Sequence, residues 1–208
     1  MKLELYFAPG ACSFVPHVGL EAAQAEFEPK LIKLHKGEHR TPAYLAMNPN
    51  GQVPVLMIDG KALTQIVAIC DFLDRRFPDA GLLPKDSWER SQALSQLAWM
   101  NSTPHTTATR FFFPERYAES DTARAEVKKR ATEDFRGYLE RIQNTLDQKS
   151  FWFRDAYLFT LLRWGGFAGI DTKSSLPAYY AYAQKLLEKP PVAAAVARER
   201  ISLDTYKA

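Results

Sequence analysis

The opening residues predict a strand, a sharp turn and then a helix, with a cysteine at the junction. Over Leu3–Phe7, apolar residues alternate with more polar ones, the period-two pattern of a strand with one buried face. Pro9-Gly10 interrupts that pattern, and apolar residues recur at helical spacing from Ser13 onwards. The junction therefore places the thiol of Cys12 at the N-terminus of a helix.

A helix N-terminus is a favourable place for a negatively charged sulfur. The first backbone N–H groups of a helix lack partners within it, and the helix dipole adds partial positive charge there. Both effects stabilise a thiolate, which predicts that Cys12 is a nucleophile or holds one. The neighbouring Ser13 is expected to cap the helix or to donate to a bound sulfur. The residues alone leave one alternative open, a small buried cysteine beside a turn.

The order of the predicted elements divides the chain near residue 80. Strands are predicted at residues 3–7, 30–34, 53–58 and 61–63, and they alternate with helices that begin near residues 13, 42 and 65. After a linker at residues 80–84, helical spacing is found at residues 88–102, 122–146, 155–164 and 178–189, with breaks at Pro104, Pro114, Gly165-Gly166 and Pro190-Pro191. We therefore expect an α/β domain over residues 1–79 and an all-helical domain over residues 86–208.

Composition narrows the class of protein. With 208 residues, 46% of them hydrophobic and 25% charged, the chain suits a folded globular protein. The net charge of +3, from 27 basic and 24 acidic residues, is too mild and too evenly spread for nucleic-acid binding. No run approaches the ~18 apolar residues that a membrane span needs. The opening Met1–Leu5 lacks a secretory core, so a cytoplasmic protein is expected.

The remaining cysteine and two histidines bear on redox and metal chemistry. Cys12 and Cys70 do not make a disulfide framework, and Cys70 lies in an apolar helical stretch where a packed core residue is expected. His35 and His39 have the spacing of zinc ligands on a helix, but Gly37 lies between them and no third ligand follows nearby. We therefore expect a loop there and no bound metal.

Several segments carry a family resemblance at their characteristic spacing. They are residues 8–13, 16–17, 48–56, 63–64, 67–69, 155–159 and 163–164. Together they resemble the glutathione S-transferase superfamily, and within it the bacterial beta-class enzymes. The resemblance implies a thioredoxin-like N-terminal domain, an all-α C-terminal domain and an active site in the cleft between them. It also implies glutathione as co-substrate, a small apolar electrophile, a homodimer and a role in detoxification.

The resemblance assigns glutathione contacts to particular residues. In the family, the proline at the position of Pro54 follows a cis peptide bond, which turns the preceding backbone outward. The N–H and C=O of Val53 would then pair with the cysteinyl backbone of glutathione, as an added strand does. Lys36 and Gln52 match positions near the glycyl carboxylate, and Asn101, further along the chain, has a family counterpart as well.

Gln65-Ile66 departs from the family pattern at the γ-glutamyl end of glutathione. Relatives have an acidic residue followed by Ser or Gly there, so the carboxylate takes the ammonium group and the next residue takes the α-carboxylate. Gln65 offers no charge, and Ile66 offers only its backbone N–H at a helix start. Losing a charge-assisted bond of ~1.5–3 kcal/mol weakens glutathione binding about ten- to a hundredfold.

Two further departures concern the thiol and a helix cap. Phe7 stands where many relatives have tyrosine, and Tyr6 is expected to point to the opposite face of the strand. No tyrosine hydroxyl is therefore expected beside the thiol. Trp152 stands where relatives have the Ser or Thr that caps the helix of Asp155, so we expect that cap to be lost and Asp155 to keep a structural role.

The helical part offers candidates for the far side of the site. His105 matches the histidine with which beta-class enzymes face the cysteine site; the alternative is a surface histidine beside a proline. Three consecutive phenylalanines, Phe111–Phe113, cannot share one helix face, so either one of them lines an apolar pocket or all three belong to the core. Three tryptophans are expected in the core of the helical part: Trp88, Trp99 and Trp164.

Three functions are compatible with these residues. In the first, a glutathione transferase, the helix N–H groups and Ser13 carry most of the thiolate stabilisation, and Cys12 and His105 lie near the sulfur. The second is monothiol redox exchange through Cys12, because Val15 replaces the second cysteine of a C-x-x-C pair. The third is non-catalytic ligand binding on a transferase scaffold, favoured by Gln65-Ile66. We place the transferase first.

Overall fold

A mixed four-stranded sheet is built from residues 3–64 of the computed structural model, which describes residues 1–146 and 151–204. The strands are β1 (Leu3–Phe7), β2 (Glu28–Leu31), β3 (Val55–Ile58) and β4 (Lys61–Thr64). Their order is β2-β1-β3-β4, with β1 parallel to β2 and antiparallel to β3. β3 and β4 form an antiparallel hairpin whose turn, Asp59-Gly60, has positive φ at both residues, as a two-residue hairpin loop requires.

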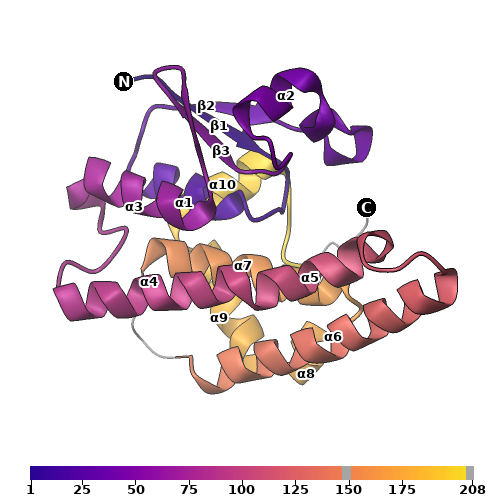
Figure 1. Cartoon of the computed structure of the whole chain (residues 1–208). Helices are drawn as coiled ribbons and strands as arrows, with labels where there is room; N and C mark the ends of the chain where they lie inside the picture. Colours follow the sequence, from indigo (N-terminus) through magenta and orange to yellow (C-terminus); the bar gives the residue numbers. More distant parts are fainter. Residues whose placement is uncertain (147–150, 205–208) are drawn as a thin grey trace.

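Helices cover the sheet and, with the loops that join them, form the rest of the described chain (Figure 1). The N-terminal part contributes α1 (Phe14–Ala22), α2 (Pro42–Met47) and α3 (Ile66–Arg76). The later helices are α4 (Ser87–Ser102), α5 (Pro104–Phe112), α6 (Asp121–Asn144), α7 (Trp152–Phe167), α8 (Thr172–Ser175), α9 (Pro177–Leu187) and α10 (Pro190–Glu199). Short 3-10 turns lie at Leu34–Lys36, Glu38–Arg40, Pro78–Ala80 and Pro114–Arg116. None of the described helices is long and apolar enough to span a bilayer.

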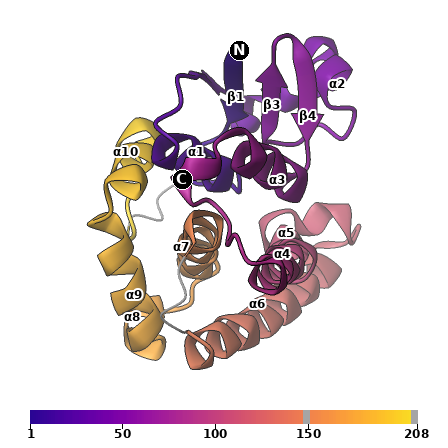
Figure 2. The ribbon, with the colours of Figure 1, turned by 90° about the vertical axis from the view of Figure 1, so that its left-hand side faces the viewer.

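The arrangement of the sheet and helices in layers brings helices from the end of the chain next to α1. In Figure 1, α1 and α3 lie between the sheet and the helical layer below it. Figure 2 shows α7 at the centre, with α4, α5 and α6 on one side and α9 and α10 on the other. α1 packs against both α7 and α10, and one continuous apolar core runs from the sheet through α1 into α7. Elements from the end of the chain therefore lie beside the first helix.

The predicted fold class is confirmed, and several predicted element boundaries are wrong. β2 begins and ends earlier than predicted because its pairing register runs from Glu4↔Glu28 to Phe7↔Leu31, so β1 limits its length. The predicted breaks at Pro104 and Pro190 are confirmed, because α4 ends at Ser102 and α9 at Leu187. Each proline also begins a further helix that was not predicted, since proline is well tolerated at the first helical position. Gly165-Gly166 lies inside α7, where a Cβ at Gly165 would meet Leu139 of α6. The domain limits at residues 79 and 86 stay a prediction.

Most of the expected core residues are buried, with one clear exception. Cys70 is fully buried, and Phe7 is buried while Tyr6 points to the opposite face of the sheet, as predicted. Trp99 is partly buried against the core and Trp164 is buried. Trp88, however, is 69% exposed, so its prediction as a core residue is wrong. It lies in the first turn of α4, where one face is still open to solvent.

Candidate functional site

Cys12 lies in the turn between β1 and α1 and is only 7% exposed. Its Sγ donates to the backbone carbonyl of Val53 at 3.4 Å. Burial raises the pKa of the Cys12 thiol to about 12, although the backbone N–H groups of Cys12 and Ser13 act to lower it. The helix start therefore does act on the sulfur, but desolvation outweighs it. Whether Cys12 acts as a nucleophile or holds one stays a prediction.

Ser13 is fully buried and holds the turn before α1 together. Its hydroxyl donates to the carbonyl of Ala8 and accepts from the N–H of Ala8, both at 3.2 Å. Ser13 is the N-cap residue of α1, but its side chain makes no capping hydrogen bond, so the predicted cap is absent. A role of this hydroxyl toward a bound sulfur stays a prediction.

Gly10 is held by two helices from the far end of the chain. Its N–H donates to Glu199 Oε2 of α10 at 2.7 Å, and its carbonyl accepts from Trp164 Nε1 of α7 at 3.0 Å. Its φ of +68° lies in the left-handed region, and a Cβ here would collide with the guanidinium of Arg163. The turn that carries Cys12 is therefore positioned from α7 and α10.

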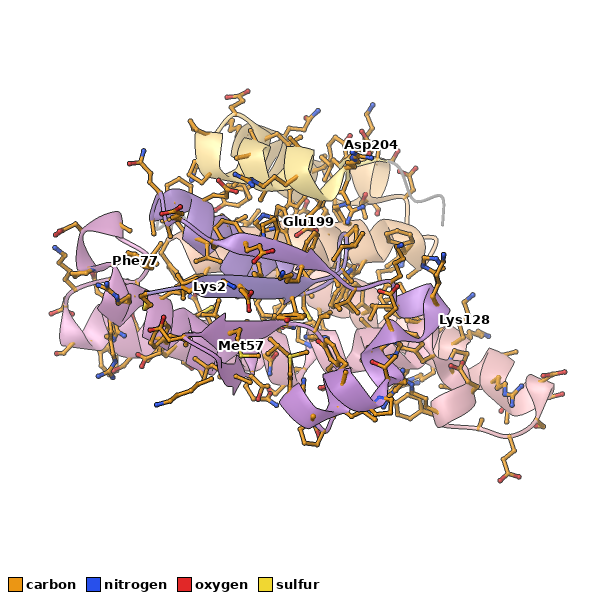
Figure 3. The ribbon with its side chains drawn as sticks, turned by 90° about the horizontal axis from the view of Figure 1, so that it is seen from above. Lys2, Met57, Phe77, Lys128, Glu199 and Asp204 are labelled. Carbon is orange, nitrogen blue, oxygen red and sulfur yellow. The ribbon has the colours of Figure 1, made fainter. Side chains whose placement is uncertain are left out.

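Glu199 also binds a histidine of α1. Its second oxygen, Oε1, lies 2.8 Å from Nδ1 of His17, and both side chains are fully buried. Figure 3 labels Glu199 where α10 meets the N-terminal elements. Burial raises the pKa of the Glu199 carboxyl above its usual range, while His17 and the N–H of Gly10 oppose that shift. One carboxylate thus links α10, α1 and the Cys12 turn.

His105, in the first turn of α5, lies in an aromatic and polar environment. Its Nδ1 is 2.7 Å from the hydroxyl of Tyr157, and its ring meets that of Trp164 edge-to-face, with 4.9 Å between the centroids. The Tyr157 hydroxyl also donates to Oδ1 of Asn101 at 3.1 Å. Burial lowers the pKa of His105 to about 4, so its imidazole is neutral at pH 7. His105 therefore adjoins the residue that holds Gly10.

The backbone around Val53 has the form that the resemblance implies. The Val53-Pro54 peptide bond is cis. The carbonyl of Gln52 accepts from the hydroxyl of Tyr44 and from Asn48 Nδ2, each at 2.8 Å. The side chains of Gln52 and Lys36 are exposed. The structure thus fixes the backbone here and leaves these two side chains facing solvent.

Gln65 and Ile66 lie where α3 begins. Gln65 is exposed and has a φ of +72°, and α3 has no side-chain cap there. The side chain of Ile66 is 4% exposed and belongs to the main core, so its bulk points into the protein. Its backbone N–H remains at the helix N-terminus, where an anion is favoured.

The three phenylalanines after His105 have different surroundings. Phe111 is buried and packs edge-to-face on Phe135, 5.1 Å away. Phe113 is covered by the guanidinium of Arg116 at 4.0 Å. The ring of Phe112 packs edge-to-face on those of Trp164 and Phe167, with 5.7 Å and 6.1 Å between the ring centroids. Phe112 is therefore the one that shares an aromatic cluster with the tryptophan beside His105.

Two other expectations concern α7 and metals. α7 has no side-chain cap, as predicted, although its N-cap residue is Phe151 and Trp152 is its first helical residue. Asp155 is buried and accepts from Tyr182 at 2.6 Å and Lys189 at 2.9 Å. These bonds give Asp155 a structural role. Within residues 1–146 and 151–204, no group of three His, Cys, Asp or Glu side chains could hold a metal.

Sequence reasoning missed three residues that shape the site: Tyr157, Trp164 in its contact with Gly10, and Glu199. A weak signal existed for two of them, because Tyr157 and Trp164 lie in segments that carry the family resemblance. Glu199 follows an alanine-rich stretch near the end of the chain and reads as a surface charge. Its 189-residue separation from Gly10 put this contact beyond any local pattern.

Known proteins resemble this chain in sequence and in fold. A profile described as the glutathione S-transferase N-terminal domain matches residues 1–75. The glutathione S-transferase GST-4.5 of Xanthomonas campestris pv. campestris is 34% identical over 96% of this chain and 100% of its own length. The structure of a glutathione transferase homologue from Sulfitobacter, with bound glutathione, superposes with a TM-score of 0.89 at 26% identity, covering 96% of this chain and 99% of that one.

A bacterial beta-class relative is also similar. The glutathione S-transferase of Sphingomonas chungbukensis has a TM-score of 0.82 and 32% identity, over 94% of this chain and 98% of its own. Such identity along nearly the whole length, together with the same fold and a buried cysteine beside a cis-proline, leads to one conclusion. The chain belongs to the glutathione S-transferase family.

Proposed function

We propose that this chain conjugates the thiolate of glutathione to a small apolar electrophile beside the N-terminus of α1. The observation that carries the proposal is the set of groups around the Cys12 turn. The Cys12 thiol donates to Val53, next to the cis-proline, while Trp164 of the helical part binds the same turn at Gly10. His105 lies directly against that tryptophan. Both parts of the chain thus contribute to one site.

Glutathione is proposed to lie along the edge formed by Val53. Its cysteinyl backbone pairs with the N–H and C=O of Val53, and this carbonyl accepts from Cys12 in the protein without ligand. The α-carboxylate of its γ-glutamyl end meets the N–H of Ile66 at the start of α3. The buried Ile66 side chain leaves that position free of steric conflict. Lys36 and Gln52 serve the glycyl carboxylate.

We propose that hydrogen bonds stabilise the thiolate of glutathione. Cys12 is one of their donors and does not form a covalent bond with the substrate. With its pKa raised to about 12, Cys12 carries its proton at neutral pH, and its single S–H turns from the carbonyl of Val53 to donate a hydrogen bond to a bound thiolate. The N–H groups at the start of α1 add to this stabilisation. Cys12→Ala should therefore keep appreciable conjugation.

The electrophile is proposed to be flat and aromatic. Phe112, Trp164 and Phe167 form an aromatic cluster next to His105, with edge-to-face contacts of 5.7 to 6.1 Å from Phe112. Such a cluster favours stacking on an aromatic ring. The sequence resemblance provides the broader class, an apolar electrophile.

A rate measurement tests this function. The purified protein, glutathione and a chlorodinitrobenzene-type substrate should react well above the spontaneous rate, and calorimetry should detect glutathione binding. Cys70→Ala, which removes the other buried cysteine, is the matched control for Cys12→Ala and should retain full activity. Binding without turnover across a panel of electrophiles would favour the ligand-binding alternative instead.

Monothiol redox exchange is the second candidate, because Cys12 lies beside the proposed position of the glutathione sulfur. Exchange requires a thiolate, which the raised pKa of Cys12 makes scarce at neutral pH. Mass spectrometry after incubation with oxidised glutathione should therefore find little adduct on Cys12. Rapid and complete modification of Cys12 would make redox exchange the better function.

The resemblance also supports finer proposals about the setting of this enzyme. We propose a homodimer, a cytoplasmic location, a role in detoxification and a division into residues 1–79 and 86–208. Light scattering of the purified protein tests the first: a mass of two chains is expected, and a mass of one chain would overturn it.

A further inference from the structure

Three helices contribute to a short chain of hydrogen bonds that ends at His105. Asn101 comes from the last turn of α4, Tyr157 from the middle of α7 and His105 from the first turn of α5. The Tyr157 hydroxyl donates to Asn101 Oδ1 at 3.1 Å and lies 2.7 Å from Nδ1 of His105. Tyr157 is fully buried, so water does not replace either partner. The transferase function proposed above gives these hydrogen bonds no role.

The number of available protons determines which atom donates in each of these hydrogen bonds. A phenol carries one proton, and here that proton is donated to Asn101 Oδ1. Toward His105 the Tyr157 oxygen can therefore only accept, so Nδ1 of His105 must carry a hydrogen. A neutral imidazole has a single N–H, and placing it on Nδ1 leaves Nε2 with a free lone pair.

Burial supports both protonation states that this count requires. It raises the pKa of Tyr157 well above its usual value, so the phenol keeps its proton. It lowers the pKa of His105 to about 4, so the imidazole is neutral at pH 7. Both groups stay uncharged near pH 7, so these hydrogen bonds persist at neutral pH.

The His105 ring lies close to the Cys12 turn. It packs edge-to-face on Trp164, with 4.9 Å between centroids, and the indole N–H of Trp164 donates to the carbonyl of Gly10 at 3.0 Å. Gly10 is two residues before Cys12. The nitrogen of His105 that Tyr157 does not bind is therefore the one available to a substrate in the proposed site.

We propose that Tyr157 is a positioning residue that fixes His105 in the Nδ1–H tautomer, so that Nε2 takes the proton of the glutathione thiol. The S–H bond breaks, the proton binds Nε2, and the electron pair stays on the sulfur, which bonds to the electrophilic carbon. A halide leaves with its bonding pair, and the imidazolium returns its proton to water. This proposal rests on the proposed transferase function for its substrate, but the tautomer of His105 is measurable without turnover.

Nitrogen NMR of protein labelled in its histidines tests the proposal. The shifts of the two ring nitrogens distinguish a protonated from an unprotonated atom, and a His105→Gln sample assigns the signal among the four histidines. The wild type should show Nδ1–H. Tyr157→Phe should give a mixture of tautomers and lower kcat about ten- to a hundredfold, with a much smaller change in KM for glutathione.

Two further variants keep the test independent of a folding defect. Asn101→Asp retains an acceptor and cannot donate when ionised, so it should keep the Nδ1–H tautomer even if Tyr157→Phe unfolds. Tyr179→Phe is the matched control, since it removes a buried hydroxyl that donates to Leu158 at 2.7 Å, and it should leave the tautomer unchanged.

Three results would overturn the proposal. They are an Nε2–H tautomer in the wild type, a switch to Nε2–H in Asn101→Asp, and equal kcat values for Tyr157→Phe and Tyr179→Phe. A protein without conjugating activity that still shows Nδ1–H would refute the proposed function while supporting the positioning of His105 by Tyr157.

Discussion

The two ends of the proposed glutathione site differ in how the protein holds them. At the sulfur end, Gly10 is bound through both its N–H and its carbonyl by α10 and α7, and the Cys12 thiol is buried. At the peptide end, the side chains of Lys36, Gln52 and Gln65 are exposed. The sulfur end is therefore fixed before glutathione binds. The exposed side chains of the peptide end become ordered only when glutathione binds.

This difference predicts that the sulfur end determines the reaction rate and that the peptide end determines the affinity for glutathione. A preorganised sulfur end costs no reorganisation during the reaction, so substitutions there should damage folding or rate together. Exposed side chains at the peptide end gain their interactions only with ligand, so substitutions there should change binding and little else. The following predictions test that separation.

Glu199→Ala should have the largest effect, on stability. It removes the buried partner of both His17 and the Gly10 N–H, and breaking such a pair costs about 3–5 kcal/mol. Urea unfolding measures the loss, and Glu199→Gln, which keeps one acceptor, should recover part of it. Glu188→Ala, an exposed glutamate at the end of α9, is the control and should change stability by under about 0.5 kcal/mol. Equal effects of the two alanine variants would show that α10 does not hold the turn.

Gly10→Ala and Gly37→Ala compare the two ends directly. Both glycines have φ near +70°, so each substitution pays the left-handed cost of about 1–2 kcal/mol. At Gly37 a Cβ would meet open space, whereas at Gly10 it would collide with Arg163. We expect a total loss of about 2–4 kcal/mol at Gly10 and only the backbone cost at Gly37. Similar unfolding midpoints for the two variants would contradict a tightly packed sulfur end.

Alkylation of Cys12 should be slow and strongly pH-dependent. The folded pKa of about 12 lies above the ordinary value of 9.0, so at pH 8 the rate should be about a hundredfold or more below that of the urea-unfolded chain. The rate should rise roughly tenfold for each pH unit. The stability that the buried neutral thiol adds is present below pH 9 and is lost as the pH rises toward 12. Peptide mapping after iodoacetamide treatment measures the rate, and rapid labelling at pH 7 would contradict burial as the dominant cause.

Gln65→Glu should have the smallest effect, confined to binding. A carboxylate at the start of α3 restores a charged partner for the γ-glutamyl ammonium, so glutathione should bind about tenfold more tightly by calorimetry. Gln52→Glu is the matched control, because the same change at the glycyl end opposes a carboxylate and should weaken binding. Weaker binding to Gln65→Glu together with tighter binding to Gln52→Glu would show that glutathione lies in the reverse of the proposed orientation, and shifts in the same direction would show that the two side chains do not face opposite ends of glutathione.

Much of the fold could be predicted because it depends on local patterns. The alternation at Leu3–Phe7, the Asp59-Gly60 turn and the helical spacing up to Phe77-Pro78 all appear as predicted. The errors lie where tertiary contacts override a local signal. Gly165 continues α7 because the helix packs closely on α6, and Trp88 is exposed although it lies in the first turn of a helix that packs on the core.

The sequence by itself determined the strand-turn-helix around Cys12, the order of the elements and the family resemblance, because these depend on residues close together in the chain. Only the tertiary structure decided the chemistry of that turn. Burial in the folded chain raises the pKa of Cys12 against the influence of its own helix N-terminus. The partners of Gly10, at Trp164 and Glu199, and of His105, at Tyr157, come from 52 to 189 residues away. Desolvation and hydrogen bonding depend on what surrounds a group in space, and local sequence patterns do not specify those neighbours.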